Sequence, residues 1–319
     1  MDTELMRFLR GAPSWARETV ERLTGIVVVV WGAATMSFVA LQLMPGDTVD
    51  ALLGPNVAAT PELRQEISRA LHLDRPLGER YLSFLGQIAV GDFGQSYRLG
   101  RPVSDVVAES VWPTVQLALA ALAFTVVLAL TLALSWALGG RAARGAVALA
   151  ELVGSSLPSY WLGIVAIGVF AFHLRWLPAA GSGTVDAVIL PAGALALPIG
   201  CVMARVLQDS FERSASAPFT LTVRARGVSW LGVTVRHHLR HAAASVLTLG
   251  GWTLASFLGG AVIIEVVFAR AGFGRTLVDA VSTRDMPVVT SITVLCALLF
   301  GGLNWVVDLV NRRIDPRIR

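Results

Sequence analysis

The sequence predicts an all-α protein with six transmembrane helices and a partly helical loop outside the cytoplasm. Of the 319 residues, 55% are hydrophobic and only 15% are charged, and the mean hydropathy is +0.65. A soluble domain carries about 25% charged residues, whereas a membrane-spanning helix needs about 20 mostly apolar residues. We expect one membrane domain, because six runs have this length: 25–44, 113–138, 147–172, 187–207, 245–268 and 287–310.

The first apolar run, 25–44, is expected to remain as a helix. It is too long for the apolar core of a cleavable signal peptide, and Met44-Pro45-Gly46-Asp47 follows it in place of a cleavage site. The segment before it, 1–24, predicts an amphipathic helix at the cytoplasmic face of the membrane.

The long connection 45–111 predicts a folded extracytoplasmic cap. Thr60-Pro61-Glu62 is a good helix start, a second helix is expected after Pro76, and a third short helix after Pro102. Nine acidic residues and six arginines are mixed along it, so no strong field of one sign is expected. A surface cap and a docking site for an external partner both remain open.

The arginines predict the orientation of the chain, because basic residues gather in short cytoplasmic loops. The N-terminal segment, the connections 139–146 and 208–244 and the C-terminal tail carry fifteen arginines, against four in the third and fifth connections. We therefore expect both termini and the loop 208–244 to face the cytoplasm, with the protein in the bacterial inner membrane.

The third apolar run is interrupted by serines and a proline at its centre. Proline frees a backbone carbonyl, and nearby hydroxyl groups can satisfy polar backbone within a membrane. Charged groups in a span usually face an interior or a water-filled path. A translocation path lined by Ser155, Ser156, Pro158, Ser159 and Glu265 is therefore one prediction, and simple helix packing is the alternative.

The cytoplasmic loop 208–244 predicts two short helices that meet at a glycine. Phe219, Val223 and Arg226 share one helical face before Gly227, and apolar residues recur at helical spacing after it. A loop of about 37 residues is long for a passive connection. The pattern favours a compact elbow that docks to a partner, although a solvated loop near lipid headgroups also explains the charge.

The sequence contains no recognisable catalytic or metal-binding constellation. All 26 basic residues are arginine, so a P-loop and a Schiff-base lysine are both excluded, and another chain must hydrolyse any ATP that is used. His237 and His241 share a helical face, but Arg236 and Arg240 beside them would repel a metal ion. We expect no bound cofactor, no metal and no nucleic acid, and we assign the two cysteines to packing.

Several blocks, in the same order along 25–319, resemble those of one family. They are Met44–Asp47, Leu73–Leu77, Gly91–Gly94, Ser156–Gly163, Trp176–Ala179, Gly272–Arg275, Arg284–Val289 and Asp315–Arg319. On these blocks the chain resembles the B-type permease subunit of ABC importers for oligopeptides, dipeptides and nickel. The stretch Leu221–Ala242 is similar to the cytoplasmic coupling loop of that family.

The resemblance implies a type I ABC importer permease fold and a set of partners. A second homologous permease would complete the substrate pathway, two ABC ATPase subunits would dock below, and a solute-binding protein would deliver the substrate from outside. The cargo would be di- or oligopeptides, with nickel or a metal chelate as the alternative. The implied ATPase-docking residues are Phe219, Thr222, Arg224, Ala225, Arg226, Gly227, Arg236 and His237.

Two other classes of membrane protein are alternatives to an ABC importer permease. A polytopic membrane enzyme predicts paired catalytic groups at one depth, and the sequence shows none. An ion-driven secondary transporter predicts an inverted repeat with a matched pair of broken helices, and only one break is visible.

Overall fold

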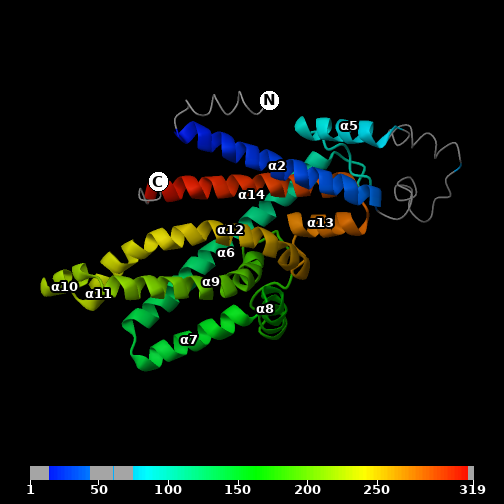
Figure 1. Ribbon diagram of the computed structural model, residues 1–319. Helices are drawn as coiled ribbons and strands as arrows, with labels where there is room; N and C mark the ends of the chain where they lie inside the picture. The colour runs from blue at the N-terminus through cyan, green and yellow to red at the C-terminus, as the bar shows by residue number, and fades with distance from the viewer. Residues whose placement is uncertain (1–13, 44–59, 61–74, 315–319) are drawn as a thin grey trace. The chain divides into compact units, whose positions relative to one another are not determined.

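The computed structural model describes residues 14–43, 60 and 75–314, which are almost entirely helical (Figure 1). Within these residues the extended structure is one isolated bridge between Gln95 and Pro102. The helices are α2 (Ser14–Leu43), α5 (Leu77–Ala89), α6 (Val103–Leu138), α7 (Arg141–Ser156), α8 (Ser159–Ala166), η1 (Ile167–His173), α9 (Asp186–Ala215), α10 (Pro218–Ala225), α11 (Trp230–Val233), η2 (Thr234–His238), α12 (Leu239–Val267), α13 (Phe273–Ser282) and α14 (Met286–Ile314).

Four of the expected runs form helices that are long and apolar enough to cross a membrane. These segments are Thr19–Ala40, Val103–Leu138, Asp186–Ala215 and Met286–Val306. The fifth run lies in the 29-residue helix α12, which contains a shorter apolar segment, Ser256–Val267. Residues 14–24 continue into the first span as part of α2.

The third run is not one straight helix. It forms α7 and then α8 with η1, and the two halves are bent by 101° at the break after Ser156. Pro158 precedes α8 with an extended backbone (φ −64°, ψ 137°) and lacks the N–H that a continuing helix needs. Within the described residues, up to five segments are therefore long and apolar enough to cross a membrane, if this bent pair counts as one span.

The expectation of a separate short helix after Pro102 is wrong. Pro102 precedes α6 itself, which runs for 36 residues and contains Pro113 in its interior. A proline inside a helix has no N–H to donate to the carbonyl four residues before it. The carbonyl of Pro113 itself accepts a hydrogen bond from Arg270 (Nη2 to O, 3.3 Å). The expected helix start at Thr60-Pro61-Glu62 lies outside the described residues apart from Thr60, whereas the helix expected after Pro76 is α5.

The described chain divides into two compact units. Unit 1 comprises 1–108 and 277–305, and unit 2 comprises 109–276 and 306–319. In unit 1, Phe38 of α2 packs against Tyr81 and Phe84 of α5, with ring centroids 5.3 and 5.4 Å apart. The hydroxyl groups of Thr35 and Tyr81 are 2.8 Å apart in the same contact.

A carboxylate in unit 1 ties the connection between α5 and α6 to the connection between α13 and α14. Asp285 accepts a hydrogen bond from the Ser96 hydroxyl and further ones from the backbone N–H groups of Tyr97 (3.1 Å) and Arg98 (3.3 Å). Ser96 and Asp285 are both buried. Residues almost 190 positions apart are therefore joined at one point, and Asp285 belongs to the block Arg284–Val289 that was singled out in the sequence.

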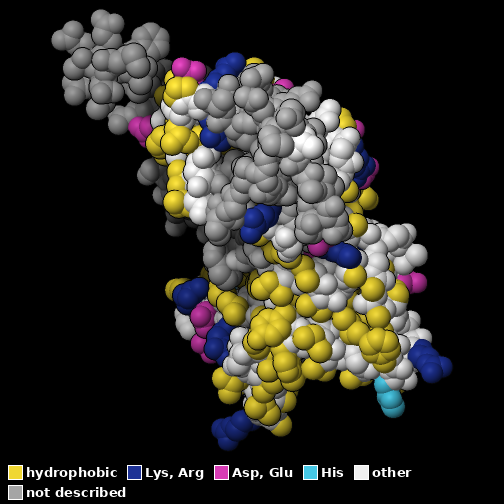
Figure 2. All heavy atoms as spheres, turned by 90° about the vertical axis from the view of Figure 1, so that its right-hand side faces the viewer, with side chains coloured by type: hydrophobic (Ala, Val, Ile, Leu, Met, Phe, Trp, Pro, Cys, Tyr) yellow, Lys and Arg dark blue, Asp and Glu magenta, His cyan; other side chains and the backbone are white. Residues whose placement is uncertain are grey.

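Unit 2 is built around α9, which packs against α7, α8 and α12. Its core gathers buried side chains from several helices, including Leu117, Leu195, Phe257, Ile264 and Phe268. Figure 2 shows hydrophobic side chains over the lower part of the face in view, at the height of α7 and α8 in Figure 1. Such an apolar exterior is expected of helices that face lipid or other membrane subunits.

Candidate functional site

The candidate site is the elbow, residues 217–241, which joins α9 to α12 in unit 2. Figure 1 shows α10 and α11 together at the end where α9 stops and α12 starts. The two short helices meet at Gly227, as the sequence spacing predicted.

Local sequence explains each turn of the elbow. Pro218 occupies the first turn of α10, where its missing N–H costs no hydrogen bond. Gly227 adopts φ +82°, a left-handed conformation that favours glycine, and its N–H donates to the carbonyl of Arg224 at 2.9 Å. Ser229 caps α11 by accepting from the N–H of Gly232 at 3.2 Å.

A buried hydrogen-bond chain fixes the elbow from inside. Thr220 is 2% exposed, and its hydroxyl donates to the carbonyl of Ser214 at 2.7 Å. The same oxygen lies 3.1 Å from Nε2 of His238, which is 1% exposed. Because the hydroxyl proton goes to Ser214, this geometry makes His238 Nε2 the donor to Thr220. The end of α9, α10 and η2 are thereby held together.

Aromatic contacts surround His238. Trp230 and Phe219 pack against its ring at centroid distances of 5.6 and 6.3 Å, and Phe219 also lies 4.9 Å from His241. The indole Nε1 of Trp230 donates to the carbonyl of Ala137 at 3.2 Å. Burial lowers the pKa of His238, and the neighbouring His237 and His241 lower that pKa further.

The outer face of the elbow combines exposed apolar side chains with arginines. Leu221 is 73% exposed and Leu231 is 55% exposed. Most of the docking residues expected from the sequence are exposed with them: Thr222, Arg224, Ala225, Arg226, Gly227 and Arg236. Of the other two, His237 is half-buried, and Phe219 is half-buried with its ring against the histidines.

Five residues of the elbow with a role in the site were not among the docking residues expected from the sequence. Leu221 and Leu231 form the apolar part of the outer face, while Thr220, Trp230 and His238 form the internal anchor. The helical periodicity before and after Gly227 carries the signal for the two leucines. Only the three-dimensional contact with Ala137, far away in the sequence, reveals the role of Trp230.

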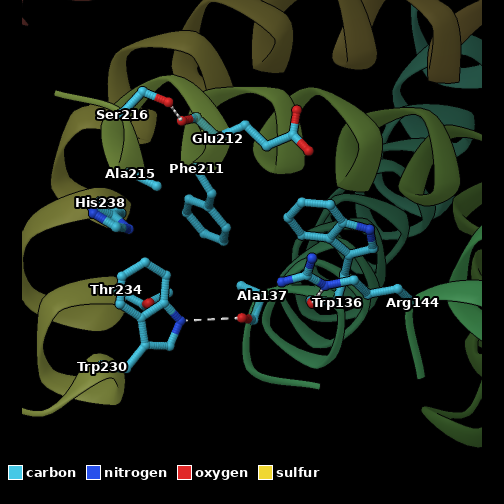
Figure 3. Close-up of a pocket in the computed structure, with 10 residues that line it drawn as sticks. All are labelled: Trp136, Ala137, Arg144, Phe211, Glu212, Ala215, Ser216, Trp230, Thr234 and His238. Atoms are coloured by element: carbon cyan, nitrogen blue, oxygen red, sulfur yellow. Dashed lines mark hydrogen bonds between the residues drawn. The ribbon is translucent and has the colours of Figure 1, made fainter. Parts of the chain in front are cut away.

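A pocket of about 370 Å³ lies behind the elbow (Figure 3). The ends of α6 and α9 and the start of α7 form one side, and Trp230, Thr234 and His238 form the other. The residues that line it are Trp136, Ala137, Arg144, Phe211, Glu212, Ala215, Ser216, Trp230, Thr234 and His238.

The candidate path residues lie at two separate places in unit 2. Ser155, Ser156 and Pro158 are exposed at the bend between α7 and α8, and Ser159 is half-buried. The Ser155 and Ser156 hydroxyls both donate to the carbonyl of Leu152, at 3.4 and 2.6 Å. Their hydroxyls thus satisfy backbone groups near the break, and their role in a path stays a prediction.

Glu265 is fully buried and caps another helix. Its carboxylate accepts from the Thr114 hydroxyl (2.6 Å) and from the N–H groups of Gly274 (2.7 Å) and Arg275 (3.3 Å) at the start of α13. Carboxylates are favourable at helix N-termini, where the backbone donors have no intrahelical partner. This geometry gives Glu265 a structural role, and its path role stays a prediction.

A second buried carboxylate of the apolar runs, Glu151, also lies in unit 2. Glu151 on α7 is 2% exposed, accepts a hydrogen bond from the Gln208 amide of α9, and lies 3.8 Å from the Arg205 guanidinium. It therefore couples one half of the bent pair to the central helix. Among the residues that the structure describes, no three His, Cys, Asp or Glu side chains gather as a metal site would require.

The comparisons with known proteins agree with this architecture. Residues 129–319 match the family model "Binding-protein-dependent transport system inner membrane component". The chain belongs to this family. It is also 32% identical to the glutathione transport system permease protein GsiC of Escherichia coli (strain K12), over 94% of this chain and 98% of the relative. The corresponding Salmonella typhi protein is 33% identical over the same shares.

A solved structure supports the same fold. The MetNI methionine ABC transporter, in an inward-facing conformation, aligns with a TM-score of 0.54 at 17% identity, over 66% of this chain and 97% of that one. The permease therefore has the type I ABC importer fold and is a multi-pass inner-membrane protein. In this peptide and nickel family the permease is a transporter subunit, and ATP is used by separate ATPases.

Proposed function

We propose that this permease imports short peptides with energy from two ATPase subunits that dock on the elbow. A second permease would complete the pathway, and an extracytoplasmic binding protein would deliver the peptide. Both termini and the loop 208–244 would lie in the cytoplasm, 45–111 would lie outside, and 25–319 would form the membrane domain.

The observation that carries the proposal is the outer face of the elbow. Leu221 and Leu231 are largely exposed beside arginines that would be expensive to place in hydrocarbon. An exposed apolar patch with a polar rim typically marks a protein interaction site. Since the internal anchor holds α10 and η2 together, a displacement of the outer face would be passed to α9 and α12.

Peptide cargo is supported by the relatives. The GsiC proteins are named for glutathione transport, and glutathione is a tripeptide. Nickel or a metal chelate is the alternative cargo for this family.

The proposal is tested by uptake into proteoliposomes that contain the permease with its partner subunits and binding protein. We expect ATP-dependent accumulation of labelled glutathione or a dipeptide, and competition by unlabelled short peptides. Nickel uptake without peptide uptake would reject the peptide assignment. Uptake driven by an ion gradient without ATP would reject the coupling mechanism.

A further inference from the structure

Arg270 is a fully buried arginine that neither the elbow nor the candidate path residues explain. It follows the last residue of α12 by three positions, and its side chain has no exposed surface. Its guanidinium donates to the carbonyls of Gly181 (3.3 Å), Ala187 (3.1 Å) and Pro113 (3.3 Å) and to the side-chain oxygen of Gln116 (3.3 Å). One side chain therefore joins the end of α12 to α6, to the first turn of α9 and to the connection 174–185 before α9. We call these five residues the clamp.

Backbone hydrogen bonds close the clamp from a second direction. The N–H of Arg270 donates to the carbonyl of Glu265 at 2.8 Å, and the N–H of Gly181 donates to the carbonyl of Phe268 at 3.1 Å. Gly181 thus both donates to and accepts from the segment at the end of α12. Its φ of +114° is readily adopted by glycine and strained for other residues. The connection before α9 is therefore fixed at a position that suits glycine.

The clamp is retained although it carries energetic costs. The Nε of Arg270 is buried and has no hydrogen-bond partner among the described residues. Ala269, directly before it, adopts φ +49°, a left-handed conformation that is strained for alanine. A well-packed apolar side chain is often as stabilising as a buried charged one, whereas strained groups gather where geometry serves function. The arrangement of helices that the clamp fixes therefore explains it better than a gain in stability does.

The three helices that meet at the clamp also meet at the elbow. The end of α9 is bonded to Thr220, α12 begins directly after His238, and Ala137 in the last turn of α6 accepts from Trp230. Between Pro113 at the clamp and Ala137 at the elbow, α6 rises roughly 36 Å at 1.5 Å per residue. Helices tied together at both ends cannot slide past one another, so they move as one body.

We propose that Arg270 is a positioning residue that makes α6, α9 and α12 move as one rigid body, so that a displacement of the elbow reaches the opposite ends of these helices. This inference rests on the proposed function, because ATPases on the elbow supply the displacement. Without the clamp, the elbow would still follow the ATPases, but the opposite ends would not follow the elbow. ATP would then be hydrolysed with little transport.

The test compares peptide uptake with ATP hydrolysis in proteoliposomes that contain the complete transporter and its binding protein. Arg270→Gln should lower the uptake per ATP hydrolysed by about tenfold. Arg270→Lys should be uncoupled as well, because lysine keeps the charge but lacks the planar fork that serves several oxygens. The matched control Arg175→Gln, which changes an exposed arginine of the connection 174–185, should stay within about twofold of the wild type.

Gly181→Ala tests the clamp with its arginine in place. The added methyl group meets open space, but φ +114° strains alanine, so the contact at Gly181 should loosen without overpacking. We expect the uptake per ATP to fall, whereas the control Gly183→Ala, which also meets open space and has no left-handed φ, should keep it. If Arg270→Gln does not assemble, Gly181→Ala decides. A merely structural role would lower uptake and hydrolysis in parallel, so an unchanged ratio in these variants would overturn the proposal.

Hydrogen exchange tests the clamp without any peptide. In Arg270→Gln, exchange should become faster at 178–188 and stay unchanged in the elbow, because only the clamp end is released. Unchanged exchange at 178–188, or an equal increase in both segments, would overturn the clamp. With the local increase present, a wild type that imports no peptide would count against the proposed function and not against the clamp.

Discussion

Replacing Glu265 tests whether this carboxylate stabilises the fold or lines a transport path. In Glu265→Ala, the Thr114 hydroxyl and the N–H groups of Gly274 and Arg275 lose their acceptor. Each buried donor left unsatisfied costs about 1–3 kcal/mol, and removal of one member of a buried charged network costs about 3–5 kcal/mol. We therefore expect a loss of about 3–5 kcal/mol, or a fall of roughly 10 °C in melting temperature.

Glu265→Gln is the informative comparison, because the amide keeps the shape and one acceptor oxygen. Its NH2 group faces donors, so we expect a smaller loss of about 1–3 kcal/mol. Thermal melting of the purified transporter and peptide uptake should fall together across the two variants, while the exposed Asp209→Asn should melt like the wild type. If Glu265→Gln melts like the wild type but transports nothing, the capping argument is refuted and a direct path role is supported.

Three further changes test the elbow and the contact that Asp285 makes in unit 1. Gly227→Ala should destabilise the elbow by about 1–2 kcal/mol because φ is +82°, and stimulation of the ATPase subunits should fall. The control Gly250→Ala in α12 adds a methyl group in open space, so it should not reduce ATPase stimulation. Burial lowers the pKa of His238 in the folded state. The stability of the protein should therefore fall as pH drops below the ordinary histidine pKa of 6.5, and it should level off below the pKa of the folded state. His238→Gln should flatten this part of a profile of melting temperature against pH, measured between about pH 8 and pH 5. Asp285→Asn should cost about 2–4 kcal/mol because one acceptor oxygen cannot serve three donors, and faster hydrogen exchange at Tyr97 and Arg98 should report it; unchanged exchange would contradict the proposed role of Asp285.

The spacing of apolar residues and the positions of proline and glycine in the sequence predicted much of the fold. The apolar runs located the long helices, Pro76 marked the start of α5, and Gly227 marked the turn of the elbow. The serine–proline block predicted a break in the third run. These features are local, because helix starts, turns and apolar faces depend on residues within about one or two turns of each other.

The remaining features depend on contacts between distant residues. Pro113 predicts a helix boundary by local rules, yet α6 passes through it, and its carbonyl gains a hydrogen bond from Arg270. The capping role of Glu265 needs α13 to lie beside it. The packing of the Phe219 ring against histidines from beyond Gly227 also joins residues far outside one helical turn. No pattern in one segment encodes these partners.

The docking of ATPases on the elbow is tested most directly by affinity purification of the tagged permease coexpressed with its partner subunits. Wild type is compared with Leu221→Glu and with Val90→Glu, a control at an 80% exposed position directly after α5. We predict that wild type and control bring down the ATPase pair and a second permease, while Leu221→Glu keeps the second permease and loses the ATPases. Retention of the ATPases by Leu221→Glu, or a wild-type chain that purifies alone, would contradict the account.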